Sequence, residues 1–394
     1  MRREKKERLI RETIRIGKII PGGMGLGENM AGKKVMLFNT LPGEVVAEFL
    51  VTKEKTHYIE GVATEFLEKA EERVMPQDEC YLSTSPFQMM NYRTELSLKE
   101  EMIRELFRKI ETPEILPLKT DGNEFYYRNK MEYSFWYDIE TGQNSLAFHR
   151  RGSHQKIIVE KSSIERKEIF VRAQEILAEM NARGEDSRKY QSLMLRCNQN
   201  GEISGGIFEK RKSHPDFSKL SDTILGRRFY YSANGFFQVN LPVYEMALLE
   251  ISQYIGEEEV LDLYAGVGTI GLSVAKNKVK LVEVDKNAYA EMVENVAEFS
   301  GAEAVLARAE EVTDFVRMEQ TVILDPPRAG CDEKLIARLN EVVPGRIIYL
   351  SCNPATQVRD IERLLAKYKI VKIQPFNFFP KTVHIENLVV LERR

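Results

Sequence analysis

From residue 259 onward, short apolar runs rich in β-branched residues alternate with segments of helical spacing. The runs are "EVLDLYAG", "VKLVEVD", "AEAVLA", "QTVILDPP" and "RIIYLSC". Strands that are apolar throughout are typical of a parallel sheet covered by helices on both faces. The pattern therefore predicts a doubly wound α/β domain over residues 229–394. Its last two runs, "KIVKIQPF" and "ENLVVLER", are joined by a loop too short for a parallel crossover, which favours an antiparallel hairpin at one edge.

The preceding chain has a different pattern. Several short strands separated by turns indicate a small β-barrel over residues 1–68, in which "GGMGLGE" (22–28) is interpreted as a loop. Mixed strands and helices over 69–228 indicate a central α+β domain. Within it, residues 93–110 have apolar side chains at helical spacing, and we expect this amphipathic helix to pack on the C-terminal domain.

Composition limits the class of protein. A chain of 394 residues with 43% hydrophobic residues can build several cores. The N-terminus, "MRREKKERLIRETIRIGK", is charged throughout and no apolar run approaches a bilayer span, so we expect a cytoplasmic protein without a membrane segment. This basic N-terminus, "FHRRGSHQK" and "EKRKSH" suit an RNA-facing surface, although a solvated charged face would have the same composition.

The four cysteines are widely separated and show no CxxC spacing, so no disulfide framework or self-contained metal site is predicted. Cys352 ends an apolar run and precedes a proline, a position taken up below. The sequence assigns no role to Cys80, Cys197 or Cys331.

A glycine-rich turn follows the first strand of the α/β domain. "VLDLYAGVGTIG" places Gly266 and Gly268 between a strand and a helix, and Glu283 ends the next strand. Glycines at this point let a ligand approach the backbone, and the acid suits ribose hydroxyls, so a nucleotide cofactor is predicted. Asp262 would suit an ammonium group and repel a pyrophosphate, which favours S-adenosylmethionine over NAD. An NAD-dependent oxidoreductase would also leave the motifs described next unexplained.

Three further motifs fall at the ends of strands. Asp325 is fixed by the prolines of "ILDPPRAG", and Cys352 follows in "YLSCNP". A cysteine thiolate can add to an electron-poor ring carbon such as C6 of uracil, which activates C5 toward methylation. The adduct must then lose the C5 proton, and Glu386 or His384 of "TVHIENLV" could be the base. Phe236 of "SANGFFQVN" could stack on a flipped base.

In this order, "ANGFFQVN", "DLYAGVGTIG", "ILDPPRAG", "LSCNPATQVRD" and "HIENLVVLER" resemble the RNA uracil-5 methyltransferase family. The resemblance implies a class I, Rossmann-like methyltransferase domain and a TRAM-like, oligonucleotide-binding fold for the N-terminal barrel. It implies that Cys352 is the nucleophile, that Glu386 rather than His384 is the base, and that Phe236 meets the target base. It also implies that Asp325 contacts both the cofactor and the uracil edge. Together with the residues of the glycine turn, the residues expected to bind the cofactor are Gln238, Asp262, Tyr264, Gly266, Gly268, Glu283 and Asp325.

Two sequence differences from related families narrow the predicted cofactors and the predicted target base. Many TRAM-bearing members ligate an iron-sulfur cluster through four cysteines, but "DECYLSTSPFQMMNYR" keeps only Cys80 and "EKSSIE" has serines at the fourth position, so no cluster is expected. Cytosine-5 RNA methyltransferases typically have a second cysteine directly after the proline turn, where this chain has Arg328.

The resemblance therefore implies an S-adenosylmethionine-dependent RNA (uracil-5-)-methyltransferase that forms a covalent adduct through Cys352. We expect a monomer acting on structured RNA, with 23S ribosomal RNA favoured and transfer RNA as the alternative. A cytosine-5 RNA methyltransferase and a non-catalytic ribosome-assembly factor are the remaining hypotheses. The factor would have no need for both Cys352 and Glu386.

Overall fold

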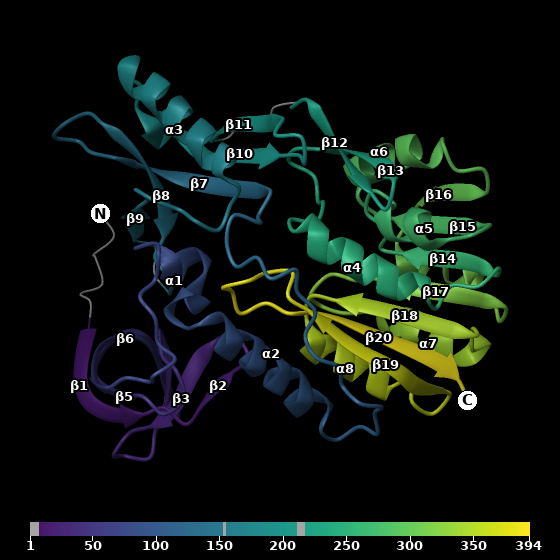
Figure 1. Cartoon of the computed structure of the whole chain (residues 1–394), viewed down its shortest axis with the longest axis horizontal. Coiled ribbons are helices and arrows are strands. Elements are labelled where there is room, and N and C mark those ends of the chain that lie inside the picture. The colour runs from purple at the N-terminus through teal and green to yellow at the C-terminus, as the bar shows by residue number, and fades with distance from the viewer. Residues whose placement is uncertain (1–7, 153–154, 211–216) are drawn as a thin grey trace.

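The computed structural model describes residues 8–152, 155–210 and 217–394. Parts of all three basic clusters, at residues 1–7, 153–154 and 211–216, lie outside the described residues. Three sheets make up most of the molecule: an N-terminal sheet, a central sheet and a C-terminal sheet (Figure 1). No helix in the described part of the chain is long and apolar enough to cross a bilayer.

The N-terminal sheet has six strands in the order β1-β5-β6-β4-β3-β2, closed around a small apolar core. Its strands are β1 (Arg8–Arg15), β2 (Lys18–Ile20), β3 (Met24–Glu28), β4 (Lys34–Phe38), β5 (Val45–Glu54) and β6 (Tyr58–Glu68). The interpretation of residues 22–28 as a loop was wrong, because most of this segment is β3. A Cβ atom at Gly25 would lie 2.2 Å from Oγ1 of Thr40, and one at Gly27 would lie 2.7 Å from the carbonyl oxygen of Arg15. These glycines thus serve close packing inside a strand.

The central sheet is antiparallel, in the order β11-β10-β7-β8-β9, and helix α3 packs on one of its faces. Its elements are β7 (Lys130–Tyr137), β8 (Asn144–His149), β9 (Lys156–Ile158), α3 (Lys167–Ala182), β10 (Tyr190–Cys197) and β11 (Ile203–Glu209). A separate hairpin, β12 (Lys219–Ile224) and β13 (Arg227–Ser232), leads to the C-terminal sheet and spans the predicted domain boundary at residue 228.

The C-terminal sheet has the order β16-β15-β14-β17-β18-β20-β19, with helices on both faces (Figure 1). Neighbours from β16 to β18 are parallel, and β20 runs antiparallel to both β18 and β19. The predicted doubly wound sheet with an antiparallel edge hairpin is therefore confirmed. Its strands are β14 (Glu259–Leu263), β15 (Val279–Glu283), β16 (Ala302–Leu306), β17 (Gln320–Leu324), β18 (Arg346–Ser351), β19 (Tyr368–Phe376) and β20 (Glu386–Arg393). Its helices are α4 (Leu241–Ser252), α5 (Thr269–Val274), α6 (Lys286–Val296), α7 (Glu333–Val342) and α8 (Pro354–Glu362).

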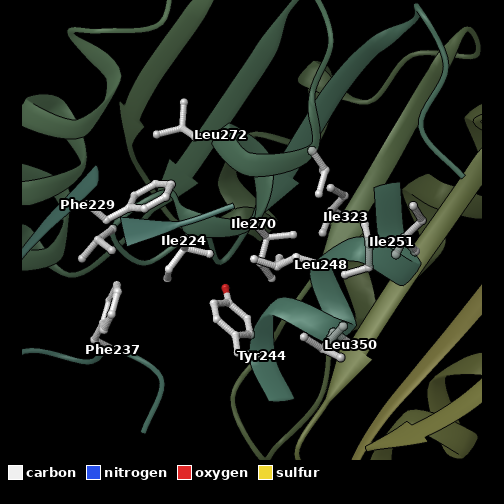
Figure 2. Close-up of a cluster of buried hydrophobic side chains, with 14 of the residues drawn as sticks. Ile224, Phe229, Phe237, Tyr244, Leu248, Ile251, Ile270, Leu272, Ile323 and Leu350 are labelled. Atoms are coloured by element: carbon white, nitrogen blue, oxygen red, sulfur yellow. The ribbon is translucent and has the colours of Figure 1, made fainter. Parts of the chain in front are cut away.

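A continuous apolar cluster lies on one face of this sheet, beneath the glycine-rich turn. Figure 2 shows side chains from the β12–β13 hairpin, α4, α5 and the central strands meeting there, with the Tyr244 hydroxyl turned toward Ile270. Because this cluster joins the hairpin and α4 to the sheet, the segment between them is held against the strand ends.

Helix α2 (Tyr92–Phe107) is joined to the loop between β19 and β20 by a buried ion pair. Lys99 and Glu95 are both fully buried and lie 2.8 Å apart. The Lys99 ammonium also donates to Oδ1 of Asn377 at 2.7 Å and to the carbonyl of Phe379 at 3.1 Å, while Glu95 accepts from the backbone N–H of Lys381 at 2.9 Å. Three hydrogen-bonding groups of the loop between β19 and β20 therefore bind one buried charge pair on α2.

We predict that Lys99→Met lowers the free energy of unfolding by about 3–5 kcal/mol, because the buried Glu95 carboxylate loses the ammonium at 2.8 Å and keeps only that of Lys381 at 3.8 Å. Urea denaturation of the full chain measures this change. Arg104→Met is the matched control on the same helix, since the Arg104–Glu100 pair is solvent-exposed and should contribute about 0–1 kcal/mol. Equal losses in the free energy of unfolding would show that the buried pair stabilises the protein no more than the exposed pair.

Candidate functional site

The glycine-rich turn after β14 adopts left-handed backbone conformations. Tyr264 has φ 66°, Gly266 has φ 58° and Gly268, the N-cap of α5, has φ 88°. A residue with a side chain is rarely found in this region, so Tyr264 is held there by its surroundings. No atom lies within 4 Å of the place where a Cβ on Gly266 would sit, which leaves the backbone open to a ligand.

Two predicted cofactor residues contact the turn from the sheet. Glu283 accepts hydrogen bonds from the backbone N–H groups of Gly266 at 2.8 Å and of Val284 and Asp285 at 2.7 Å each. Asp262 is fully buried, and its Oδ2 accepts from the N–H of Gly271 at 2.8 Å. Burial raises the pKa of Asp262 to about 8. Its Oδ1 has no partner among the described residues, so this buried acceptor is still open to a donor.

The three predicted residues of the chemistry lie at the ends of neighbouring strands. Asp325 follows β17, Cys352 follows β18 and Glu386 begins β20, and these strands lie side by side in the sheet. Cys352 comes directly after Ser351, which pairs with Asn387, the residue after Glu386. The sheet thus brings the thiol and both carboxyl groups to one edge.

The pKa shifts show that these groups interact. Burial raises the pKa of the Cys352 thiol to about 11, and the charges of Glu386 and Asp325 raise it as well. Burial raises the pKa of Asp325 to about 7. Burial, together with the charge of Asp325, raises the pKa of Glu386 well above its ordinary value. In the free protein the thiol is therefore protonated at neutral pH.

Arg328 supplies a positive charge that opposes those of the two carboxyl groups. The sequence pattern had predicted no role for it in the site. Arg328 lowers the pKa of both Cys352 and Glu386. Its carbonyl accepts from Nδ2 of Asn353 at 2.9 Å, which ties it to the residue after Cys352. One Nη of Arg328 lies 3.3 Å from Nδ1 of His384. The signal in the sequence was its place directly after the two prolines that follow Asp325.

His384 contacts this cluster but is poorly suited to act as the base. Burial lowers its pKa to about 4, and the charge of Arg328 lowers it further. The imidazole is therefore neutral at physiological pH and a weak proton acceptor. Of the two bases left open by the residue pattern, Glu386 fits the electrostatics better.

The segment 232–240 carries Phe236 and Gln238 and is held by the central sheet. Phe236 is 69% exposed and Gln238 is buried. The Asn129 side chain donates to the carbonyl of Gln238 at 3.0 Å, and Nζ of Lys130 donates to the carbonyls of Asn234 and Gly235 at 3.0 and 3.1 Å. Sequence spacing could not reveal these contacts, because about a hundred residues separate the partners.

The other three cysteines are buried. Cys80 lies within hydrogen-bonding distance of the carbonyl of Lys161, at 3.6 Å, and the hydroxyl of nearby Ser163 donates to Asp78. Across the described ranges, no three His, Cys, Asp or Glu side chains are grouped to hold a metal ion. The expected lack of an iron-sulfur cluster stays a prediction.

All the predicted site residues lie in a part of the chain that matches a known family. Residues 209–394 match the family described as tRNA (uracil-5-)-methyltransferase. This match covers a little under half of the chain and includes the whole C-terminal sheet. Two similar proteins, from Bacteroides thetaiotaomicron and Enterococcus faecalis, are each named an uncharacterized RNA methyltransferase. They are 27% and 28% identical; each match covers 90% of this chain and 95% and 91% of the relative, respectively. The family match and these relatives confirm the resemblance to RNA methyltransferases seen in the motifs.

A solved structure shares the whole fold. It is the Pyrococcus abyssi tRNA (uracil-54, C5)-methyltransferase in complex with S-adenosyl-L-homocysteine, with a TM-score of 0.74 and 24% identity over 97% of this chain and 100% of that chain. The predicted class I methyltransferase fold, preceded by β-rich and mixed regions, is therefore confirmed.

We predict that Arg328→Met slows alkylation of Cys352 by iodoacetamide near pH 8 by roughly threefold to tenfold. Removing the guanidinium raises the thiol pKa, so less thiolate is present at a given pH, and raising the pH should restore the rate. Mass spectrometry of timed samples measures the modification, and the buried cysteines should react little. Arg363→Met, at the other end of α8, is the control. An unchanged rate in Arg328→Met would show that its charge does not act on the thiol.

Proposed function

We propose that this protein transfers a methyl group from S-adenosylmethionine to C5 of a uridine in RNA through a covalent adduct with Cys352. The observation that carries the proposal is the meeting of Cys352, Asp325 and Glu386 at one sheet edge. A thiol and a carboxylate of raised pKa are the nucleophile and the base that C5 methylation requires.

The residues of the glycine turn fit the cofactor. The unpartnered Oδ1 of Asp262 can accept a hydrogen bond from an ammonium group, and the carboxylate of Glu283 keeps lone pairs for ribose hydroxyls beyond its backbone bonds. Val284 and Leu306, at the ends of adjacent strands, are 49% and 42% exposed and offer apolar surface to an adenine ring. The Pyrococcus abyssi relative with bound S-adenosyl-L-homocysteine supports this assignment. When bound, the cofactor supplies an electrophilic methyl group.

The chemistry assigned to the protein's own residues is as follows. The Cys352 thiolate forms a bond to C6 of the uracil, which makes C5 nucleophilic enough to accept the methyl group. Glu386 then removes the proton from C5, the C6–S bond breaks, and the thiolate is regenerated. Because its pKa is raised, Glu386 is a stronger base than an ordinary carboxylate. Arg328 stabilises the thiolate form at the start and the end of this sequence.

The target uridine must leave its stack for the thiol to reach C6, and the exposed ring of Phe236 is placed to stack on it. The sequence favours 23S ribosomal RNA as substrate, and this stays a prediction. Transfer RNA is the second candidate, supported by the family description and by the Pyrococcus abyssi enzyme.

We expect wild-type protein with labelled S-adenosylmethionine to produce 5-methyluridine in ribosomal or transfer RNA that lacks it, and Cys352→Ala to produce none. Nucleoside mass spectrometry measures the product, and the RNA that accepts the label identifies the substrate. Label in 5-methylcytidine would overturn the choice of uracil. Transfer to neither RNA would favour a non-catalytic RNA-binding factor.

We predict that Glu386→Gln retains attack by Cys352 but loses proton removal, so a covalent protein–RNA adduct accumulates that survives denaturing electrophoresis. Loss of the base should lower turnover by about 10²–10⁴-fold. His384→Gln is the matched control and should give little adduct. Adduct accumulation in His384→Gln rather than Glu386→Gln would reassign the base.

A further inference from the structure

One face of the central sheet is covered by α3, and the opposite face presents an exposed tryptophan. Met131, Tyr133 and Phe135 of β7 are buried in the cluster that includes α3. Successive side chains of a strand alternate between faces, so Trp136 points to the other side of the sheet, where it is 45% exposed. It is the only tryptophan in the chain.

A second exposed apolar side chain, Ile158, lies on this face of the sheet, and Ala147, on the strand between the two, is fully buried. Ser134 of β7 pairs with Ala147 of β8, and Ala147 pairs with Ile158 of β9, so these residues share a face with Trp136. Ile158 is 44% exposed. We call the surface formed by Trp136, Ile158, Lys156 and Lys210 the open face.

Positive charges gather at the end of β7 beside Trp136. The Lys156 ammonium donates to the carbonyl of Phe135 at 2.6 Å, and the Lys210 ammonium donates to the carbonyl of Arg188 at 2.6 Å. The two ammonium groups are close enough for Lys210 to lower the pKa of Lys156. Carbonyl oxygens do not cancel a charge, so this end of the open face attracts anions.

The same strand leads to the candidate active site. β7 begins at Lys130, whose ammonium binds the carbonyls of Asn234 and Gly235 directly before Phe236. Six residues separate Lys130 from Trp136, which is about 20 Å along a strand. Trp136 therefore lies on the strand whose first residue holds the segment of Phe236, with the exposed Glu132 and the partly buried Ser134 between Lys130 and Trp136 on the same face.

We propose that the open face binds single-stranded RNA next to the target uridine, with a base stacked on Trp136 and phosphates near Lys156 and Lys210. The proposal rests on the proposed function and specifies its substrate as RNA in which unpaired nucleotides flank the target. Aromatic rings interleaved with cations are the means by which proteins hold single strands, because every base has a stacking face and every nucleotide a phosphate.

Fluorescence tests the proposal directly, because all tryptophan emission comes from Trp136. We expect an oligouridylate of about twelve nucleotides to quench this emission and to shield it from acrylamide, whereas a duplex of equal length has a smaller effect. No cofactor is present, so the result does not depend on catalysis. Unchanged emission when filter binding shows the oligonucleotide bound would overturn the proposal, and an equal response to the duplex would replace it with shape recognition of a helix.

Variants separate stacking from charge. Trp136→Ala should weaken oligouridylate binding by roughly fivefold to a hundredfold, and Trp136→Phe should retain most of the affinity. Lys156→Ala should lower the salt dependence of binding by about one ion. Val171→Ala removes an even more exposed apolar side chain from α3 on the other face and should change neither the affinity nor its salt dependence. Equal affinities for Trp136→Ala and Val171→Ala would contradict the proposal.

Methylation assays keep the two proposals distinct. If Trp136→Ala raises KM for RNA and leaves kcat near the wild-type value, the open face binds substrate. If oligouridylate quenches Trp136 but no 5-methyluridine forms, the RNA surface stands and the proposed reaction fails. If methylation proceeds with an unchanged KM in Trp136→Ala, the reaction stands and the open face is not part of the substrate site.

Discussion

The buried charge pair of Lys99 and Glu95 is the interaction on which the arrangement of the site most depends. Burial lowers the pKa of Lys99, so its charge persists only because Glu95, Asn377 and a backbone carbonyl surround it. Two of these partners belong to the loop that leads into β20, whose first residue is Glu386. The same loop contains His384. A helix from the first third of the chain thus fixes the approach to the proposed base.

The central sheet imposes a second constraint of the same kind. Asn129 and Lys130 hold the segment with Phe236 by binding its carbonyl groups, so the ring that we propose to stack on the base is positioned from outside the C-terminal sheet. Carbonyls that are bonded in this way cannot shift without leaving the buried Asn129 amide unsatisfied. The strand ends supply the reacting groups, and the earlier domains orient the loops around them.

The sequence predicted what depends on local pattern and left out what depends on distant contacts. Apolar runs fixed the sheet, and Cys352 and Glu386 could be placed because their motifs fall at strand ends. Lys99 could not be found, because a lysine in an amphipathic helix has the same pattern whether its ammonium meets water or Asn377. The segment 22–28 was misread for a related reason: glycine signals a loop, but Gly25 is required by the side chain of Thr40 on a neighbouring segment.

The charges of the site explain how a reactive thiol can remain stable in the free protein. Burial, aided by two neighbouring carboxyl groups, keeps the pKa of Cys352 at about 11, and Arg328 only partly offsets these effects. A positive charge brought close to Asp325 would lower the pKa of the thiol and of both carboxyl groups together, because opposite charges favour the ionised form of each. The proposed cofactor carries such a charge, so if Asp325 contacts it as proposed, cofactor binding and activation of the thiol would be coupled through the same carboxylates. The carboxyl groups that help keep the free thiol protonated would thus also make its ionisation depend on a cationic ligand.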